Sequence, residues 1–87
     1  MREVLSLYQF NALDVSSRGT YLWEHGQFLS NGGDDSGLFA FYSLHDYFVE
    51  VIFDLEFNTI VSLVPFKAGP RYERLLDVLR IPNLLNS

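Results

Sequence analysis

The chain has 87 residues, of which 48% are apolar, 16% aromatic and 20% charged. This length allows one domain, residues 1–87, and the composition is globular rather than disordered. The chain contains no cysteine, which excludes a disulfide framework, a cysteine nucleophile and thiolate-held zinc or iron–sulfur sites. We therefore expect no bound metal and no cofactor.

The charge is acidic and unevenly distributed. Six basic residues stand against eleven acidic ones, giving a net charge of -5, and no Lys or Arg lies between Gly19 and Phe66. Such a body repels phosphate, so nucleic acid is not an expected partner. It can attract a basic protein partner, although the same charge also keeps a small apolar protein soluble.

The hydropathy pattern predicts neither a membrane span nor a secretion signal. No apolar run approaches the roughly 18 residues that cross a bilayer. The first six residues, MREVLS, lack the apolar segment of a signal peptide. We therefore expect a cytoplasmic protein that does not bind membranes.

Two helices are predicted at the N-terminus. Ser6 and Gln9 have the spacing of a capping box, which predicts a short helix reaching about Leu13. Asp14 or Ser16 can cap a second helix that runs to about residue 25. Gly26 is then expected to stop this helix in a left-handed conformation.

Four short strands should follow the helices. Their connections are too short for parallel crossovers, which favours an antiparallel meander. The loop is expected over residues 31–37 because it contains three glycines and two acids. The predicted strands span residues 27–30, 38–44, 47–54 and 59–66, with turns at 45–46 and 55–58.

A C-terminal amphipathic helix completes the prediction. Pro70 suits the first helical position, and Pro82 is expected to end the helix. Its apolar stripe at helical spacing consists of Tyr72, Leu75, Leu76 and Leu79. Leu84 and Leu85, in the tail that follows, are expected to dock. The element order is α-α-β-β-β-β-α, an α+β fold with an antiparallel sheet.

The sheet carries more apolar residues than one buried face requires. In the third strand, Tyr47, Val49, Val51 and Phe53 share the first face, while the second face also holds aromatic and aliphatic residues. Helices can cover both faces, a second copy can cover one, or a different protein or apolar ligand can do so. The second-face contacts that we expect in a homodimer are Phe39, Phe41, Phe48, Glu50 and Ile52.

Few residues suggest chemistry, and no catalytic motif is present. A candidate ligand pocket between helix and sheet is formed by Tyr21, Trp23 and His25. Glu50 and Asp54 are interpreted as solubilising charges on an exposed face. The basic residues of the C-terminal region can pair with acids of the sheet, within or between chains; they are Lys67, Arg71 and Arg74.

Two segments carry a resemblance. The run WEHGQFL at residues 23–29 and the run YFVEV at residues 47–51, followed by an amphipathic helix, resemble small uncharacterised bacterial α+β proteins of similar length. The resemblance covers most of the chain and implies the α+β fold. It implies no activity, cofactor or catalytic residue.

The sequence favours a non-enzymatic protein–protein interaction protein that forms a homodimer through the second sheet face. One form of this hypothesis is an acidic protein, similar to immunity proteins or antitoxins, that masks a basic partner. The alternative is a small-ligand-binding protein or enzyme that uses the pocket near Trp23 and His25.

Overall fold

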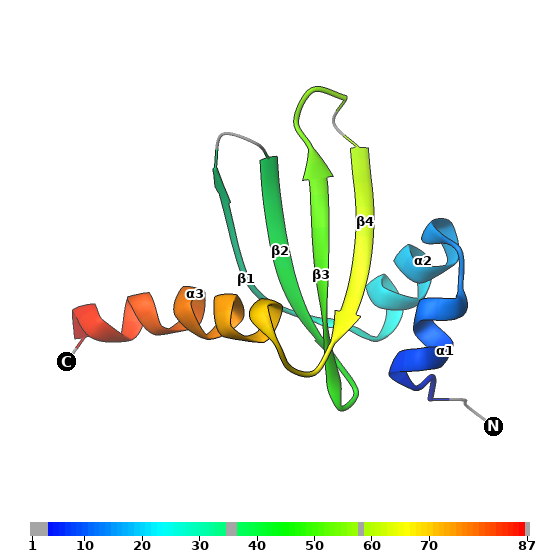
Figure 1. The fold of residues 1–87 in the computed structure, drawn as a ribbon, viewed down its shortest axis with the longest axis horizontal. Helices are drawn as coiled ribbons and strands as arrows, with labels where there is room; N and C mark the ends of the chain where they lie inside the picture. Colours follow the sequence, from blue (N-terminus) through cyan, green and yellow to red (C-terminus); the bar gives the residue numbers. More distant parts are fainter. Residues whose placement is uncertain (1–3, 35–36, 58, 87) are drawn as a thin grey trace.

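The predicted order of elements is confirmed. The computed structural model describes residues 4–34, 37–57 and 59–86. Its strands form one antiparallel sheet in the order β1-β2-β3-β4, a meander. The elements are α1 (Leu7–Ala12), α2 (Val15–His25), β1 (Gln27–Asp34), β2 (Gly37–Leu44), β3 (Tyr47–Asp54), β4 (Thr59–Phe66) and α3 (Pro70–Asn86) (Figure 1).

Both N-terminal helices begin at side chains that accept the first free backbone N–H groups. The Gln9 amide donates to Ser6 Oγ at 3.1 Å, and the Ser6 amide donates to Gln9 Oε1 at 2.9 Å, which completes the capping box. Asp14 rather than Ser16 caps α2, because its Oδ1 accepts the Ser17 amide at 2.7 Å. This backbone hydrogen bond from Ser17 lowers the pKa of Asp14.

The predicted left-handed stop at Gly26 is wrong. The residue is extended, with φ -84° and ψ 163°, because the chain passes from α2 directly into β1. A Cβ at this position would meet Leu22 Cδ1 at 2.6 Å. Glycine therefore permits close packing against the last turn of α2 rather than a left-handed backbone.

Strand β1 is longer than the sequence predicted. The expected loop over residues 31–37 is wrong for residues 31–34, which pair with β2 in a regular register, and for Gly37, which begins β2. Residues 35–36 lie outside the described residues. Gly32 pairs with Phe39, and a Cβ at Gly32 would meet the Phe39 ring at 2.7 Å. This glycine leaves room for an aromatic ring from the neighbouring strand, a pairing that stabilises sheets.

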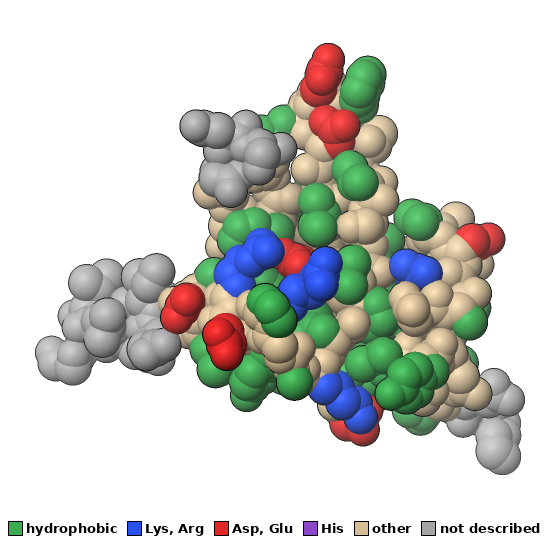
Figure 2. Space-filling view, viewed as in Figure 1, with side chains coloured by type: hydrophobic (Ala, Val, Ile, Leu, Met, Phe, Trp, Pro, Cys, Tyr) green, Lys and Arg blue, Asp and Glu red, His purple; other side chains and the backbone are tan. Residues whose placement is uncertain are grey.

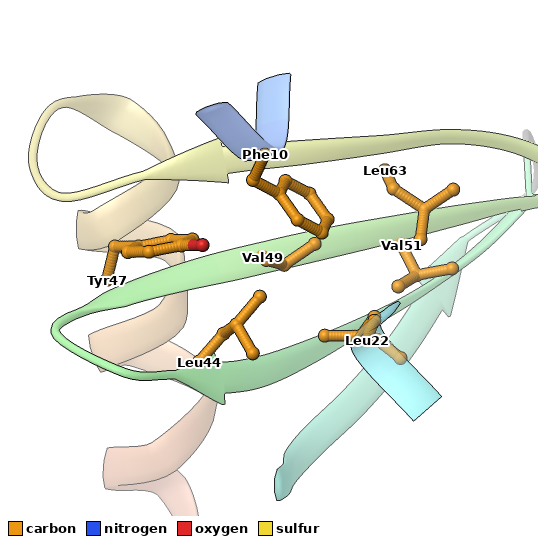
Figure 3. Close-up of a cluster of buried hydrophobic side chains, with 8 residues drawn as sticks. Phe10, Leu22, Leu44, Tyr47, Val49, Val51 and Leu63 are labelled. Atoms are coloured by element: carbon orange, nitrogen blue, oxygen red, sulfur yellow. The ribbon is translucent and has the colours of Figure 1, made fainter. Parts of the chain in front are cut away.

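Helices cover both faces of the sheet. On the first face, Phe10 of α1 and Leu22 of α2 pack against buried side chains of β2, β3 and β4 (Figure 3). On the second face, Leu75 of α3 packs with Phe41 and Phe66. Of the three explanations for the excess apolar surface, helices on both faces is the one that the structure shows.

Helix α3 does not end at the predicted residue. Pro82 was expected to stop it, but the helix continues to Asn86. A proline removes one backbone hydrogen bond and strains the helix locally, but it does not force the following residues out of helical geometry. The C-terminal part of α3 consequently projects past the β1 side of the sheet (Figure 1).

Candidate functional site

A buried ion pair fixes α3 on the second face. Glu50 has no exposed surface, and its two carboxylate oxygens accept from Arg71 Nε at 2.9 Å and Arg74 Nη1 at 2.8 Å. Basic side chains gather in the middle of this face in Figure 2. The interpretation of Glu50 as a solvated charge is therefore wrong, because α3 crosses directly over it. The predicted pairing of the C-terminal arginines with a sheet acid is confirmed within the chain.

The structure divides the predicted second-face contacts into two groups. Phe41 is fully buried, and the Phe48 ring lies 5.9 Å from the ring of Tyr72 on α3. Phe39 and Ile52 are only half-buried, and they pair with each other across β2 and β3. We call the half of the second face around Phe39 and Ile52, next to the β1–β2 and β3–β4 connections, the distal half.

A Tyr–His cluster lies on the first face where α2 meets the β2–β3 turn. It consists of Tyr21, His25, His45 and Tyr47. The Tyr21 ring is 4.4 Å from the ring of His25 and 5.7 Å from that of His45. Tyr21 Oη lies 2.6 Å from His45 Nε2. The structure thus brings together two residues of the predicted pocket and adds His45, which the sequence had placed only in a turn.

Hydrogen bonds of this cluster hold the N-terminal segment. Tyr21 Oη accepts the Leu5 amide at 3.0 Å, which leaves the Tyr21 proton available to His45 Nε2. Tyr47 donates its hydroxyl proton to the Leu5 carbonyl at 3.0 Å. Both peptide groups of Leu5 are therefore bound by tyrosines, so the cluster anchors the chain just before α1.

His45 has a backbone conformation that is rare for its residue type. Its φ is 58°, and it occupies the first position of the two-residue turn between β2 and β3. Glycine is the usual residue at a positive φ in such hairpins. In this strained backbone conformation, the His45 imidazole contacts Tyr21 and Tyr47.

The burial of Tyr47 predicts a pH dependence of stability. Burial raises the pKa of Tyr47 from 10.0 to about 12, and Tyr21 and Asp46 add to the rise. The unfolded chain therefore loses this proton first as the pH increases. We expect the free energy of unfolding to fall between pH 10 and about 12, by up to about 1.4 kcal/mol per pH unit.

Urea unfolding across this pH range measures the effect. Tyr47→Phe should abolish the Tyr47 part of the slope, while Tyr8→Phe should leave it unchanged because Tyr8 is 83% exposed. Equal slopes in the two variants would contradict the assignment to Tyr47.

Trp23 lies apart from the Tyr–His cluster. Its ring is 5.5 Å from Tyr42 on β2, and Tyr42 in turn is 5.6 Å from Phe28 on β1, both in edge-to-face geometry. We call these three residues the aromatic patch. Trp23 is 51% exposed and Phe28 is 52% exposed. The patch is thus an accessible aromatic surface beside β1.

An open groove of about 390 Å³ runs along α2. Tyr21 is part of its lining, but neither Trp23 nor His25 is. Its lining residues are Leu5, Leu13, Ser16, Ser17, Thr20, Tyr21 and Glu24. The three residues of the predicted pocket therefore do not line one groove.

The β4 edge of the sheet is protected. Pro65 lies on this strand, and proline interrupts the donors that another strand would use. Arg18 of α2 donates from Nη1 to the Leu63 carbonyl at 2.9 Å. The same guanidinium binds the carbonyls of Leu13 at 2.9 Å and Asn11 at 2.7 Å. One side chain therefore ties the α1–α2 corner to β4.

The β1 edge lacks these protections. Within the described part of the chain, β1 pairs only with β2, so its outer side has no strand partner. Residues 27–33, QFLSNGG, contain no charge and no proline. A bulge between Phe28 and Ser30 is the one irregularity of its pairing with β2. Together with the aromatic patch, this edge forms the candidate interaction surface.

Only Trp23 of this surface was predicted from the sequence. In the observed register Asp34 pairs with Gly37, and Phe28 pairs with Tyr42 once the bulge is counted. The expected loop over residues 31–37 hid this register. The aromatic patch was therefore absent from the predicted sites, apart from Trp23.

Comparisons with known proteins add no relatives. No family model, no curated protein and no solved structure matches the chain. Among the described residues, no group of three or more His, Asp or Glu side chains is placed to hold a metal ion. No helix in this part of the chain is both long and apolar enough to span a membrane.

Proposed function

We propose that this protein is a non-enzymatic interaction protein that acts as a homodimer joined through its β1 edges. The observation that carries the proposal is the contrast between the two sheet edges. The β4 edge is blocked by Pro65 and by the Arg18 bond to Leu63, whereas the outer side of β1 has no strand partner within the described part of the chain. Proteins that remain monomeric protect such edges with charge, proline or covering elements.

Antiparallel pairing of β1 with the same strand of a second copy satisfies these backbone groups. The two-fold axis then stands perpendicular to the sheet, and two four-stranded sheets become one of eight strands. Each body carries a charge of -5, but residues 27–33 are uncharged, so no like charges oppose one another over these residues.

The aromatic patch supports a protein partner at this edge. Phe28 lies on β1 itself, and Trp23 and Tyr42 extend the apolar surface beside it. Tryptophan, tyrosine and phenylalanine are enriched in the buried centres of protein interfaces. The aromatic patch lies at the β1 edge, so a partner strand that pairs with β1 would also bury part of the patch.

This proposal moves the dimer contact from the second face to the β1 edge. Phe41, Phe48 and Glu50 already pack beneath α3 of their own chain, so they offer little surface to a partner. The homodimer of the original hypothesis is retained, with a different primary contact.

Light scattering coupled to size exclusion, over a wide concentration range, tests the proposal. The expected native mass is twice 10.0 kDa. Backbone amides of β1 should also exchange with solvent more slowly at high protein concentration than after strong dilution. A mass of 10.0 kDa at every concentration would overturn the proposal.

A further inference from the structure

We infer that the distal half of the second face binds an aliphatic carboxylate, whose head group contacts Arg71 and Arg74 and whose apolar tail lies across the sheet. The ligand contacts a sheet face rather than the β1 edge, so this inference goes beyond the proposed function and does not depend on the homodimer. It assigns a class of ligand to the part of the sheet that α3 leaves partly open.

The floor of the site is an apolar part of the sheet. Phe39 and Ile52 pair across β2 and β3, and both are half-buried. Phe39 lies at the rim of the buried cluster beneath α3, and Ile52 belongs to neither of the two buried clusters of the described residues. Hydrophobic side chains occupy the sheet between α3 and the connections at the far end of the strands (Figure 2). An apolar tail placed here removes exposed apolar surface from water.

Two guanidinium groups lie at the end of this floor that is nearest to α3. Arg71 and Arg74 each give one nitrogen to Glu50, and Arg74 Cζ also lies 5.0 Å from the centre of the Phe39 ring. Their side chains are 43% and 49% exposed, so further N–H groups of both are accessible to a ligand. The buried carboxylate thus holds two arginines in place beside the apolar floor, which lowers the entropic cost of binding.

The local charge selects a singly charged anion. Two arginines and one glutamate leave a charge of +1 at this position, on a chain whose net charge is -5. One carboxylate balances this excess, and arginines bind carboxylates through well-directed, charge-assisted hydrogen bonds. A phosphate group would bring a second negative charge close to the Glu50 carboxylate, and this repulsion disfavours it.

Acidic residues at the far end of the floor determine the direction of the ligand. Asp54 and Glu56 lie where β3 ends, and the Glu56 amide donates to Asp54 Oδ1 at 2.8 Å. These charges repel a carboxylate at that end, so the head group belongs at the arginines. From Glu50 to Asp54 the strand rises by about 13 Å, and the tail lies along this length. A medium-chain aliphatic carboxylate has the required single charge at one end and no polar group along the tail.

Calorimetric titration with octanoate, below the concentration at which it forms micelles, tests the site. We expect saturable binding to the unmodified protein. Octanol has a similar tail without a charge, and octyl phosphate carries a phosphate instead of the carboxylate. Both should bind at least about tenfold more weakly than octanoate.

A triple variant tests the role of the arginines. Glu50→Met, Arg71→Met and Arg74→Met together replace the whole ion group by apolar side chains, a change that leaves no stranded charge and that proteins often tolerate. The chain becomes one charge more negative. Lys67→Met makes the same change in charge at a side chain that is 55% exposed and pairs with Asp46. The affinity for octanoate should fall at least about tenfold in the triple variant and stay within about twofold in Lys67→Met.

Amide chemical shifts of the unmodified protein locate the ligand without any substitution. Octanoate should shift the amides of Phe39, Ile52 and residues 71–75. Amides around Trp23 should not shift, because Trp23 packs against Tyr42 on the first face. This measurement and the octanol comparison decide the question even if the triple variant does not fold.

Each other outcome overturns the inference. Absence of saturable binding excludes the site, and equal binding of octanol excludes recognition of the carboxylate. Tighter binding of octyl phosphate excludes the selection of a single charge. Equal weakening in the triple variant and in Lys67→Met reduces the effect to net charge, and shifts centred on Trp23 place the ligand elsewhere. The native mass does not enter these readouts, so a monomeric protein would overturn the homodimer and leave this site in place.

Discussion

Substitution of Phe28→Lys together with Asn31→Lys is expected to convert the proposed dimer into a monomer of 10.0 kDa. In the dimer, these two changes place four lysines along the paired β1 strands, where like charges face one another. They also remove an exposed aromatic ring of the patch. We expect the dissociation constant to rise by about 100-fold or more, as measured by light scattering and by analytical ultracentrifugation.

The matched control also replaces one asparagine and one phenylalanine by lysine, at two exposed positions outside β1. Asn11→Lys with Phe57→Lys adds the same charge and also removes an exposed phenylalanine, since Asn11 is exposed on α1 and Phe57 is 68% exposed in the β3–β4 connection. This variant should remain dimeric. If the native mass fell to that of the monomer in both variants, the added charge alone would explain the dissociation. That result would contradict pairing through β1.

The second large effect is expected at the ion pair beneath α3. Arg71→Met together with Arg74→Met removes both donors to Glu50 and keeps much of the apolar cover. The carboxylate, which has no exposed surface, is then left without its partners. We expect the free energy of unfolding to fall by about 3–5 kcal/mol. Urea denaturation measures this at one fixed protein concentration, because the proposed dimerisation would itself add stability.

Glu50→Met provides the comparison. It removes the buried charge and leaves two arginines whose side chains are 43% and 49% exposed and therefore hydrated. Replacing a buried charge by an apolar side chain of similar size costs much less than stranding it, and we expect a change within about 1 kcal/mol. A Glu50→Met variant as unstable as the double arginine variant would show that the pair itself, rather than the desolvated carboxylate, dominates.

The parts of the fold that depend on neighbouring residues were predicted well. The Ser6–Gln9 capping box and the Asp14 cap are local hydrogen bonds, so the side chains that make them are visible in the sequence. Strand β3 was predicted with its observed bounds because its alternation of residues matches the two faces. The meander followed from the short connections.

The failures share a dependence on distant contacts. Glycines 32 and 33 gave β1 the composition of a loop, but pairing with β2 and the ring of Phe39 outweigh this weak local preference. Glu50 was taken as exposed because its charge is typical of a solvated face. Only the position of α3, which crosses the sheet more than twenty residues later, explains its burial.

The candidate surface was predicted only in part. The β1 residues of the proposed contact carry no motif, and part of the difference between the two edges arises from a long-range bond. Arg18 reaches the Leu63 carbonyl across 45 residues of sequence. No pattern of spacing or composition reveals such a bond, so the sequence favoured the apolar second face instead.

The bond from Arg18 to Leu63 also bears on how many copies the proposed assembly can hold. A sheet with two accepting edges adds a neighbour on each side and grows without limit, as fibres do. In the proposed homodimer, the closed β4 edge leaves each copy with one strand edge for pairing. Pairing at β1 would use that edge, so the assembly would stop at two chains.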